Sequence, residues 1–294
     1  MTYSEIWHRI ATSHDDGEAR AIARILIEEL FGLSYTDIVC GATEQLSADD
    51  TLRLDTAVRR IEQGEPLQHV LGYADFCGNR FSVNGSVLIP RPETEWLVDE
   101  GAKLMNGCIA SDETQHKAPH SPKRILDIGT GSGCIAISLK LRLGDAYVEA
   151  WDISEEALRT AQDNADALKA EVVFRKRDAL RADNTAAPWD LIVSNPPYIC
   201  DSERSAMDDN VLLHEPHTAL FVPDDDPLRF YRAIARYALL TLNAGGSLLF
   251  ECNTRYAEAT GAMLRDMGFE EVTVSDDCFG LPRFVRGRKN SHNQ

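Results

Sequence analysis

The feature of this sequence that most limits how the chain can fold is an apolar run that ends at two consecutive prolines. Residues 191–193 read as a buried strand, and Pro196 and Pro197 follow almost at once. Proline has no N–H to give to a sheet ladder, so the strand cannot continue through them. Asn195 and Tyr198 flank the prolines and are therefore expected at the end of a buried strand.

A strand end of this composition predicts a pocket for a planar amino group. Asn195 offers a side-chain oxygen and Pro196 a main-chain oxygen, and Pro197 has no N–H that would compete for either. The ring of Tyr198 can stack on the face of such a group. Amides and exocyclic amines have this shape. The alternative interpretation is a rigid turn with a half-buried tyrosine, and the rest of the chain must decide between them.

A glycine-rich turn points to a cofactor. Residues 124–128 predict a strand, and the five residues before a helix that starts at Cys134 are Gly129, Thr130, Gly131, Ser132 and Gly133. Glycines let the backbone approach a ligand closely, and a helix N-terminus favours negative charge. The next strand, 147–151, ends in Asp152, whose carboxylate can accept both hydroxyls of a ribose. Together these features predict a site for a nucleoside-containing cofactor.

A third predicted strand, 172–175, leads to Asp178, which is placed to accept from an adenine amino group or is simply a surface carboxylate. Further strands are expected over 246–251, 272–274 and 283–285, and helices over 227–240 and 254–267. Alternating strands and helices predict a parallel α/β sheet with helices on both faces. Residues 287–294 read as a polar tail.

The first part of the chain has a different pattern. One helix is expected over 16–31, capped by Asp16, and another from Ser47 to Gly64. No strand pattern precedes residue 75, so residues 1–75 are expected to form a helical domain. That stretch has 6 basic and 14 acidic residues, a net charge of −8, which suits a solvated and protein-binding surface.

The connection to the larger domain is expected to be a β-hairpin within residues 76–95. Residues 81–83 and 87–89 alternate in polarity around Asn84-Gly85, a strong hairpin signal. A helix then starts near Pro90 and runs to about residue 107, and 108–123 read as a surface loop. Residues 96–294 are the predicted catalytic domain.

Composition narrows the classes of partner. A net charge of −17 argues against a nucleic-acid backbone, which is bound by Lys and Arg. Seven scattered cysteines with no CxxC spacing indicate neither disulfides nor a zinc site, and we expect no metal.

No apolar run is long enough for a membrane span and the N-terminus lacks a signal-peptide pattern, so a soluble cytoplasmic protein without membrane contact is expected.

The combined motifs resemble a known family. The glycine turn, Asp152, Asp178 and the Asn-Pro-Pro-Tyr segment together look like a methyltransferase that uses S-adenosylmethionine and acts on a planar nitrogen. The stretches 64–72 (GEPLQHVLG) and 88–95 (LIPRPETE), with the helical N-terminal domain, resemble the PrmC/HemK family over nearly the whole chain. That family methylates the glutamine of the Gly-Gly-Gln motif in class I peptide chain release factors.

The resemblance carries expectations for fold and site. It implies the class I methyltransferase fold, Rossmann-like, with seven strands of which the last is antiparallel. It implies that S-adenosylmethionine, converted to S-adenosylhomocysteine, lies against the glycine turn, Asp152, Asp178, Ala179 and Asn195. The glutamine amide would lie against Asn195, Pro196, Pro197 and Tyr198. Relatives often carry a larger side chain than Ala179, and 76–78 (FCG) is a variant of an aromatic-rich stretch.

Three other functions share some of these features. An adenine-N6 DNA methyltransferase also holds a planar amino group, but it would want a basic cleft and a target-reading domain. A glutamine methyltransferase of a ribosomal protein is the closer rival, and residues 89–95 match the release-factor enzymes better. A cofactor-binding partner without catalysis would not need the pocket at Asn195 to Tyr198.

Overall fold

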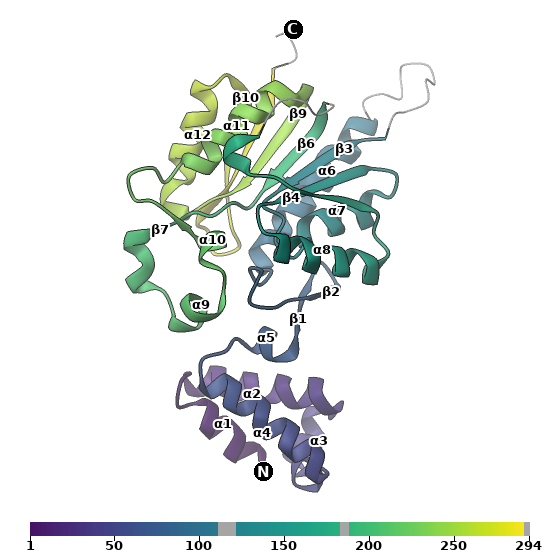
Figure 1. Cartoon of the computed structure of the whole chain (residues 1–294), viewed down its shortest axis with the longest axis vertical. Helices are drawn as coiled ribbons and strands as arrows, with labels where there is room; N and C mark the ends of the chain where they lie inside the picture. The colour runs from purple at the N-terminus through teal and green to yellow at the C-terminus, as the bar shows by residue number, and fades with distance from the viewer. Residues whose placement is uncertain (111–121, 183–187, 291–294) are drawn as a thin grey trace. The chain divides into compact units, whose positions relative to one another are not determined.

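The computed structural model describes residues 1–110, 122–182 and 188–290 of the chain (Figure 1). The chain divides into two compact units. The smaller comprises residues 1–73, 83–85 and 207–214, and the larger comprises 74–82, 86–206 and 215–294. Each is described below by itself.

The smaller unit is built of helices around one apolar core. Its helices are α1 (Tyr3–Ile10), α2 (Asp16–Phe31), α3 (Tyr35–Val39), α4 (Ala48–Glu62), α5 (Leu67–Leu71) and α9 (Asp209–His214). Ile22 and Leu26 lie one turn apart on α2 and are both buried, as helical spacing requires. They share a core with Ile6, Val58 and Ile61, so the expected helical character of this region is confirmed.

Helix boundaries in this unit follow capping chemistry. Asp15, not Asp16 as expected, caps α2, because its carboxylate accepts from the N–H groups of Gly17 and Glu18. The predicted cap of α4 is confirmed: Ser47 Oγ accepts from Asp50 N at 3.1 Å. Gly64, with φ of 84°, follows the end of that helix.

The hairpin lies earlier than the sequence pattern suggests. Its strands are β1 (Tyr73–Phe76) and β2 (Asn79–Ser82), and residues 83–91 contain no strand. Cys77 and Gly78 both have positive φ, 48° and 74°, the backbone that a two-residue turn of type I′ needs. Gly85 does not have positive φ, so Asn84-Gly85 does not make the expected turn.

The larger unit is organised around a seven-stranded sheet of order β10-β11-β9-β6-β3-β4-β5. Its strands are β3 (Arg124–Ile128), β4 (Tyr147–Asp152), β5 (Val172–Lys176), β6 (Trp189–Ser194), β9 (Leu242–Glu251), β10 (Phe269–Asp276) and β11 (Pro282–Lys289). Strands β9, β6, β3, β4 and β5 pair in parallel, and β11 is antiparallel to both neighbours. The expected sheet with an antiparallel last strand is confirmed. A separate parallel pair joins β7 (Ile199–Cys200) to β8 (Phe221–Val222).

The register of the central strands determines which residues meet at the sheet edge. Ile128 on β3 pairs with Trp151 on β4 and with Ser194 on β6. The residue after each of these three is therefore brought to the same edge, and those residues are Gly129, Asp152 and Asn195.

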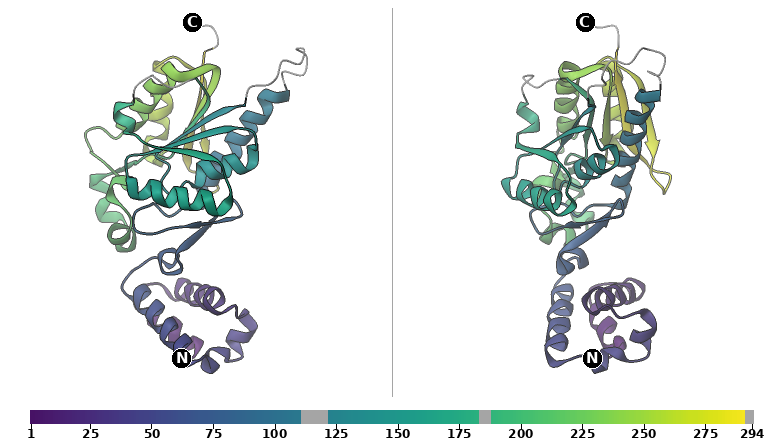
Figure 2. Two further views of the ribbon diagram at one scale, coloured as in Figure 1. Left: turned by 45° about the vertical axis from the view of Figure 1, so that its right-hand side comes forward. Right: turned by 90° about the vertical axis from the view of Figure 1, so that its right-hand side faces the viewer.

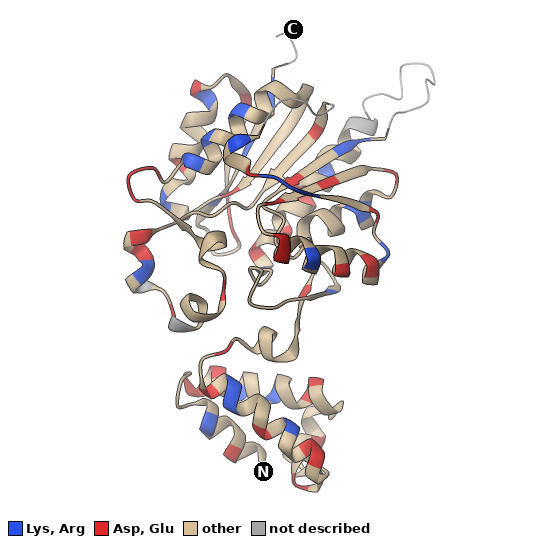
Figure 3. Cartoon of the chain, in the orientation of Figure 1, with Lys and Arg blue, Asp and Glu red and all other residues tan. Residues whose placement is uncertain are grey.

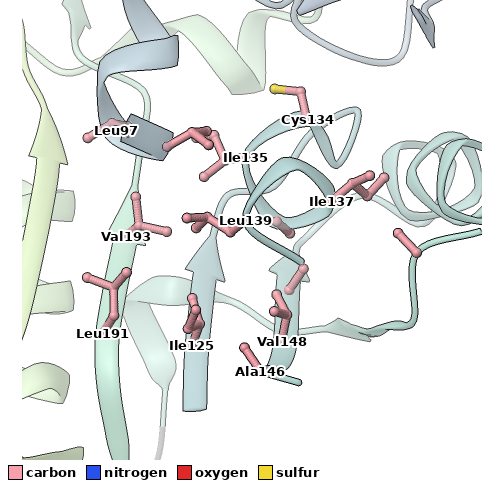
Figure 4. Close-up of a cluster of buried hydrophobic side chains, with 14 of the residues drawn as sticks. Leu97, Ile125, Cys134, Ile135, Ile137, Leu139, Ala146, Val148, Leu191 and Val193 are labelled. Atoms are coloured by element: carbon pink, nitrogen blue, oxygen red, sulfur yellow. The ribbon is translucent and has the colours of Figure 1, made fainter. Parts of the chain in front are cut away.

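Helices cover both faces of the sheet (Figure 2). One face packs against α6 (Glu95–Ala110), α7 (Cys134–Leu143) and α8 (Glu155–Leu168). Figure 4 shows Ile135 and Leu139 of α7 over the strands that carry Ile125 and Val193. The opposite face packs against α11 (Arg229–Thr241) and α12 (Ala257–Asp266). Because strand residues alternate between faces, neighbours in sequence such as Ile125 and Leu126 enter different cores.

Two boundaries differ from expectation. Helix α6 continues to Ala110, three residues beyond its expected end, and most of the expected 108–123 loop lies outside the described residues. Strand β11 includes residues 287–289 of the expected tail, because these residues pair with β9 and β10 in the sheet. Arg288 Nη1 donates to Glu271 Oε1 at 2.7 Å, and Lys289 Nζ donates to Leu242 O at 2.7 Å. Residues 291–294 lie outside the described residues.

No helix among the described residues is both long enough and apolar enough to span a membrane.

Two glycines of the turn after β3 give a matched test of this packing. A methyl group on Gly133 would lie 2.9 Å from Ile137 Cδ1 and 3.1 Å from Ala161 Cβ, whereas one on Gly131 would meet nothing within 4 Å. Both residues have positive φ, which costs an alanine about 1–2 kcal/mol. Gly133→Ala should therefore lower the free energy of unfolding by about 2–4 kcal/mol and Gly131→Ala by about 1–2 kcal/mol. Urea denaturation without added cofactor measures both, and equal losses would contradict the packing described.

Candidate functional site

A pocket of about 350 Å³ opens at the carboxyl edge of the sheet in the larger unit. Its walls come from residues 86–88, Gly129 and Gly131, residues 152–154 after β4, 177–180 after β5, 195–197 after β6, and residues between 216 and 234. Parallel sheets bind their ligands at this edge. The sequence motifs at the ends of four separate strands, β3, β4, β5 and β6, therefore converge on one cavity.

The glycine turn forms the floor of the pocket at two positions only. Gly129 and Gly131 line the cavity, while Thr130 and Ser132 are buried and Gly133 packs against α7 and α8. The N–H groups of Gly129 and Thr130 donate to Trp151 O at 2.8 and 2.9 Å, which ties the turn to β4.

Beneath the turn, Thr130 Oγ1 donates to Asp127 Oδ2 at 2.7 Å. Asp127 is fully buried, and burial raises the pKa of its carboxyl group to about 7.

Asp152 presents a fixed carboxylate to the cavity. Its Oδ2 accepts from Gly131 N at 3.0 Å and its Oδ1 accepts from Ser154 N at 2.9 Å. Burial raises the pKa of Asp152, while these backbone N–H groups oppose the rise. A carboxylate oxygen can accept more than one hydrogen bond, so both Asp152 oxygens remain able to accept from a ligand.

The wall after β5 is a short turn of helix, η3 (Ala179–Arg181). Asp178 caps it, since its Oδ1 accepts from Leu180 N at 2.9 Å, and Asp178 also pairs with Arg181 at 3.6 Å. Ala179 lines the cavity, and apolar surface there is added by Leu180, and by Ile153 beside Asp152. Sequence reasoning missed Ile153 and Leu180, although both directly adjoin predicted site residues.

The Asn-Pro-Pro-Tyr segment forms the opposite wall. Asn195, Pro196 and Pro197 line the cavity, whereas Tyr198 does not. The Tyr198 ring packs against the core under α11, and its hydroxyl donates to Glu251 Oε1 at 3.3 Å. Burial, and then the charge of Glu251, raise the pKa of Tyr198. The predicted tyrosine is thus held behind the pocket wall.

Hydrogen bonds to backbone carbonyl groups hold this segment from both ends. Ser194 Oγ donates to Ile128 O at 2.6 Å, and Tyr198 N donates to Leu220 O at 3.2 Å. Among the described residues, no backbone N–H group donates to the Pro196 carbonyl. Pro196 therefore keeps the free acceptor that the sequence predicts.

Two side chains behind Asn195 were not identified from the sequence. Asn195 Nδ2 donates to Thr94 Oγ1 at 3.3 Å, and Thr94 Oγ1 donates to Glu251 Oε2 at 2.7 Å. Glu251 is the last residue of β9, the neighbour of β6 in the sheet. The sequence signal that could have identified Glu251 is a carboxylate at the end of an apolar strand, and that strand lies next to β6, the strand before Asn195.

An ion pair between the buried carboxylate of Glu215 and the partly exposed Arg91 supports the remaining wall. Glu215 has a side chain 1% exposed; its Oε1 accepts from Arg91 Nη2 at 2.5 Å and its Oε2 from Ile89 N at 3.2 Å. These contacts join residues 86–91 to the segment that begins at Pro216, and both segments line the cavity. The partners are more than a hundred residues apart in sequence, so no local pattern could have predicted them.

Two further expectations concern Cys77 and metals. Cys77 is not among the pocket residues; its backbone N–H donates to Glu95 Oε1 at 2.7 Å and its side chain packs against the core beneath α6 and α7. Within residues 1–110, 122–182 and 188–290, no group of three or more His, Cys, Asp or Glu side chains is placed to hold a metal ion.

The strand order and the pocket at the carboxyl edge define the class I fold of S-adenosylmethionine-dependent methyltransferases. The family model described as "Methyltransferase small domain" matches residues 95–220. Among solved structures, the hMettl16 catalytic domain in complex with MAT2A 3′UTR hairpin 6 is similar with a TM-score of 0.53 and 17% identity, over 84% of each chain. That likeness concerns the fold.

Sequence comparison identifies the family. The model described as "PrmC N-terminal domain" matches residues 9–72. The release factor glutamine methyltransferase of Bacteroides thetaiotaomicron is 43% identical over 92% of this chain and 93% of its own. That of Flavobacterium psychrophilum is 36% identical over 94% of each chain. The chain belongs to the release factor glutamine methyltransferase family, which confirms the resemblance to PrmC/HemK.

Proposed function

We propose that this protein transfers a methyl group from S-adenosylmethionine to the side-chain amide nitrogen (N5) of the glutamine in the Gly-Gly-Gln motif of class I peptide chain release factors. The observation that carries the proposal is the pair of acceptors on one pocket wall, Asn195 and Pro196, facing a cavity that also contains Asp152. Relatives over nine-tenths of the chain are named for this activity.

The cavity has the chemistry that the cofactor requires. The Asp152 carboxylate, held by two backbone N–H groups, is placed to accept from ribose hydroxyls. Apolar contact for adenine comes from Ala179, with Leu180 and Ile153 supplying the bulk that Ala179 lacks, and Asp178 is the acceptor for the adenine amino group. Gly129 and Gly131 leave room for a ligand against the backbone, and Thr130, Ser132 and Gly133 hold the turn in shape.

When bound, S-adenosylmethionine supplies a methyl group on a positively charged sulfur and leaves as S-adenosylhomocysteine. The chain's own task is to present the amide nitrogen. Asn195 Oδ1 and the Pro196 carbonyl accept the two amide hydrogens, which aims the nitrogen's face at the methyl group. Such positioning lowers a barrier by on the order of 7–11 kcal/mol. Acceptors beside a nitrogen that gains positive charge add electrostatic stabilisation.

The remaining motif residues hold this geometry. Pro197 contributes no N–H, so the Pro196 carbonyl stays free for the substrate. Tyr198 fixes the end of the segment from behind the pocket wall, through the hydrogen bond from its hydroxyl to Glu251. No strong base is required, because the nitrogen becomes acidic once it carries the methyl group and then loses its proton.

We assign selection of the protein substrate to the helical domain of residues 1–75, with residues 76–95 as the connection and 96–294 as the catalytic domain. A single glutamine offers too few contacts to distinguish one protein from another. Acidic and basic residues both occur along the helices of this region (Figure 3), and its net charge of −8 favours a partner with basic patches.

The activity itself is tested with purified protein, labelled S-adenosylmethionine and a class I release factor. We expect one methyl group on the glutamine of the Gly-Gly-Gln motif, mapped by mass spectrometry, and none on a release factor whose motif glutamine is replaced by alanine. Duplex DNA and ribosomal proteins serve as parallel substrates. Incorporation into adenine or into a ribosomal protein, with none into release factor, would overturn the proposal.

Asp152→Ala should weaken S-adenosylmethionine binding about ten- to a hundredfold, because charge-assisted hydrogen bonds contribute roughly 1.5–3 kcal/mol. Titration calorimetry measures the affinity directly. Asp163→Ala is the matched control, since Asp163 is an exposed carboxylate on α8 outside the cavity. Unchanged affinity in Asp152→Ala would remove Asp152 from the cofactor site.

Asn195→Ala should lower kcat by roughly a hundredfold or more while cofactor affinity stays nearly intact, since the acceptor it removes serves the substrate amide. Single-turnover methylation and calorimetry on the same preparation separate the two effects. If cofactor affinity falls in parallel with turnover, Asn195 acts chiefly on the cofactor and its assignment to the substrate is wrong.

A further inference from the structure

Glu251 is a buried carboxylate linked to both ends of the Asn-Pro-Pro-Tyr segment, directly to Tyr198 and through Thr94 to Asn195. It is 1% exposed, and its two oxygens face different partners. Oε1 accepts from the Tyr198 hydroxyl at 3.3 Å, and Oε2 accepts from Thr94 Oγ1 at 2.7 Å. Through Thr94 it reaches Asn195, whose Nδ2 lies 3.3 Å from Thr94 Oγ1. None of these contacts was predicted from the sequence motif.

The direction of each hydrogen bond in this chain is determined by Glu251. An ionised carboxylate can only accept, so Thr94 must donate its single hydroxyl hydrogen to Glu251. The Thr94 oxygen then has only lone pairs to offer on its other side. The neighbouring Asn195 amide must therefore turn its NH2 group toward Thr94, which leaves its Oδ1 for the cavity that Asn195 lines.

This direction matters because the two ends of an asparagine amide have nearly the same size but opposite hydrogen-bonding character. If the amide were reversed, its NH2 group would meet the NH2 group of a substrate amide, donor against donor. The shape of the pocket alone distinguishes the two orientations poorly. The polarity of the partner behind Asn195 distinguishes them strongly.

The partners of Glu251 are arranged around an accepting carboxylate. Burial raises the pKa of Glu251, with a smaller contribution from nearby Glu93, whereas the Thr94 hydroxyl, the Arg283 guanidinium and the Tyr198 hydroxyl favour the charged form. The Arg283 guanidinium is itself held by Asp277 at 2.8 Å. Burying a carboxylate costs free energy, and the two hydroxyl donors offset part of that cost. A purely packing role at the end of β9 would be filled better by an apolar residue.

We propose that Glu251 and Thr94 are positioning residues that orient the Asn195 amide, so that its oxygen faces the substrate amide. The proposal rests on the proposed function for the identity of that substrate. It adds two residues that do not touch the substrate and act through Asn195: Thr94, directly before α6, and Glu251, at the end of β9. Their task is to determine which end of Asn195 the substrate meets.

Substitutions at Thr94 test the hydroxyl separately from the shape of the side chain. Thr94→Val keeps the volume of the side chain but removes the hydroxyl that accepts from Asn195 and donates to Glu251. Thr94→Ser keeps this hydroxyl. We expect Thr94→Val to lower kcat about five- to tenfold or more, with KM for release factor and Kd for S-adenosylmethionine within twofold of the parent. Thr94→Ser should retain most of the kcat. Equal kcat in Thr94→Val and the parent, or equal losses in both variants, would overturn the proposal.

Glu251→Gln tests the carboxylate against a matched control. Glutamine can donate to Thr94 as well as accept, so the orientation of Asn195 is no longer imposed and kcat should fall by a similar factor. Glu149→Gln is the control: Glu149 is also buried on a strand and accepts from a tyrosine hydroxyl, but it lies outside the cavity. Equal losses of kcat in the two variants would show a general effect of removing a buried charge.

A readout independent of activity comes from the Asn195 side-chain NH2 signal in ¹H–¹⁵N spectra of the protein without ligands, assigned through Asn195→Ala. The signal should shift in Thr94→Val and in Glu251→Gln and stay near its parent position in Thr94→Ser and Glu149→Gln. An unchanged Asn195 NH2 signal in Thr94→Val would contradict the role of Thr94 in orienting the Asn195 amide. A parent enzyme that methylates no release factor would instead overturn the proposed function, so the two failures are distinguishable.

Discussion

Parallel pairing of β3 with β4 on one side and β6 on the other is the constraint on which the whole site depends. Because Ile128 is in register with both Trp151 and Ser194, the next residue of each strand emerges at the same edge. Those residues are a glycine, an aspartate and an asparagine, which together can hold a nucleoside and an amide. A shift of one residue in either pairing would turn one of them to the wrong face and separate the two halves of the site.

Local chemistry explains which parts of the fold could be predicted from the sequence. The buried strands, the glycine turn and the cap at Ser47 depend on neighbours in sequence, and the structure has them where expected. The hairpin was placed wrongly because Asn84-Gly85 is a stronger turn signal than Cys77-Gly78, yet the chain adopts positive φ at Cys77. A non-glycine residue with positive φ is unusual, so sequence preference pointed elsewhere.

The site shows the same division between local and long-range information. The groups that line the cavity, Gly131, Asp152 and Asn195, follow recognisable strand ends and were predicted. The groups that hold them, such as Thr94 behind Asn195 and Glu215 behind the opposite wall, belong to distant segments. Only the folded chain shows that these residues meet, because their pairing is set by the crossing of elements far apart in sequence.

The central claim is that Asn195 and Pro196 hold a glutamine amide beside the cofactor pocket. A crystal structure of this protein with S-adenosylhomocysteine and a peptide containing Gly-Gly-Gln tests it most directly. The account predicts the glutamine nitrogen within hydrogen-bonding distance of both Asn195 Oδ1 and the Pro196 carbonyl, on the side of the cofactor sulfur. A peptide bound with its glutamine away from Asn195, or with the Asn195 NH2 group facing it, would contradict the account.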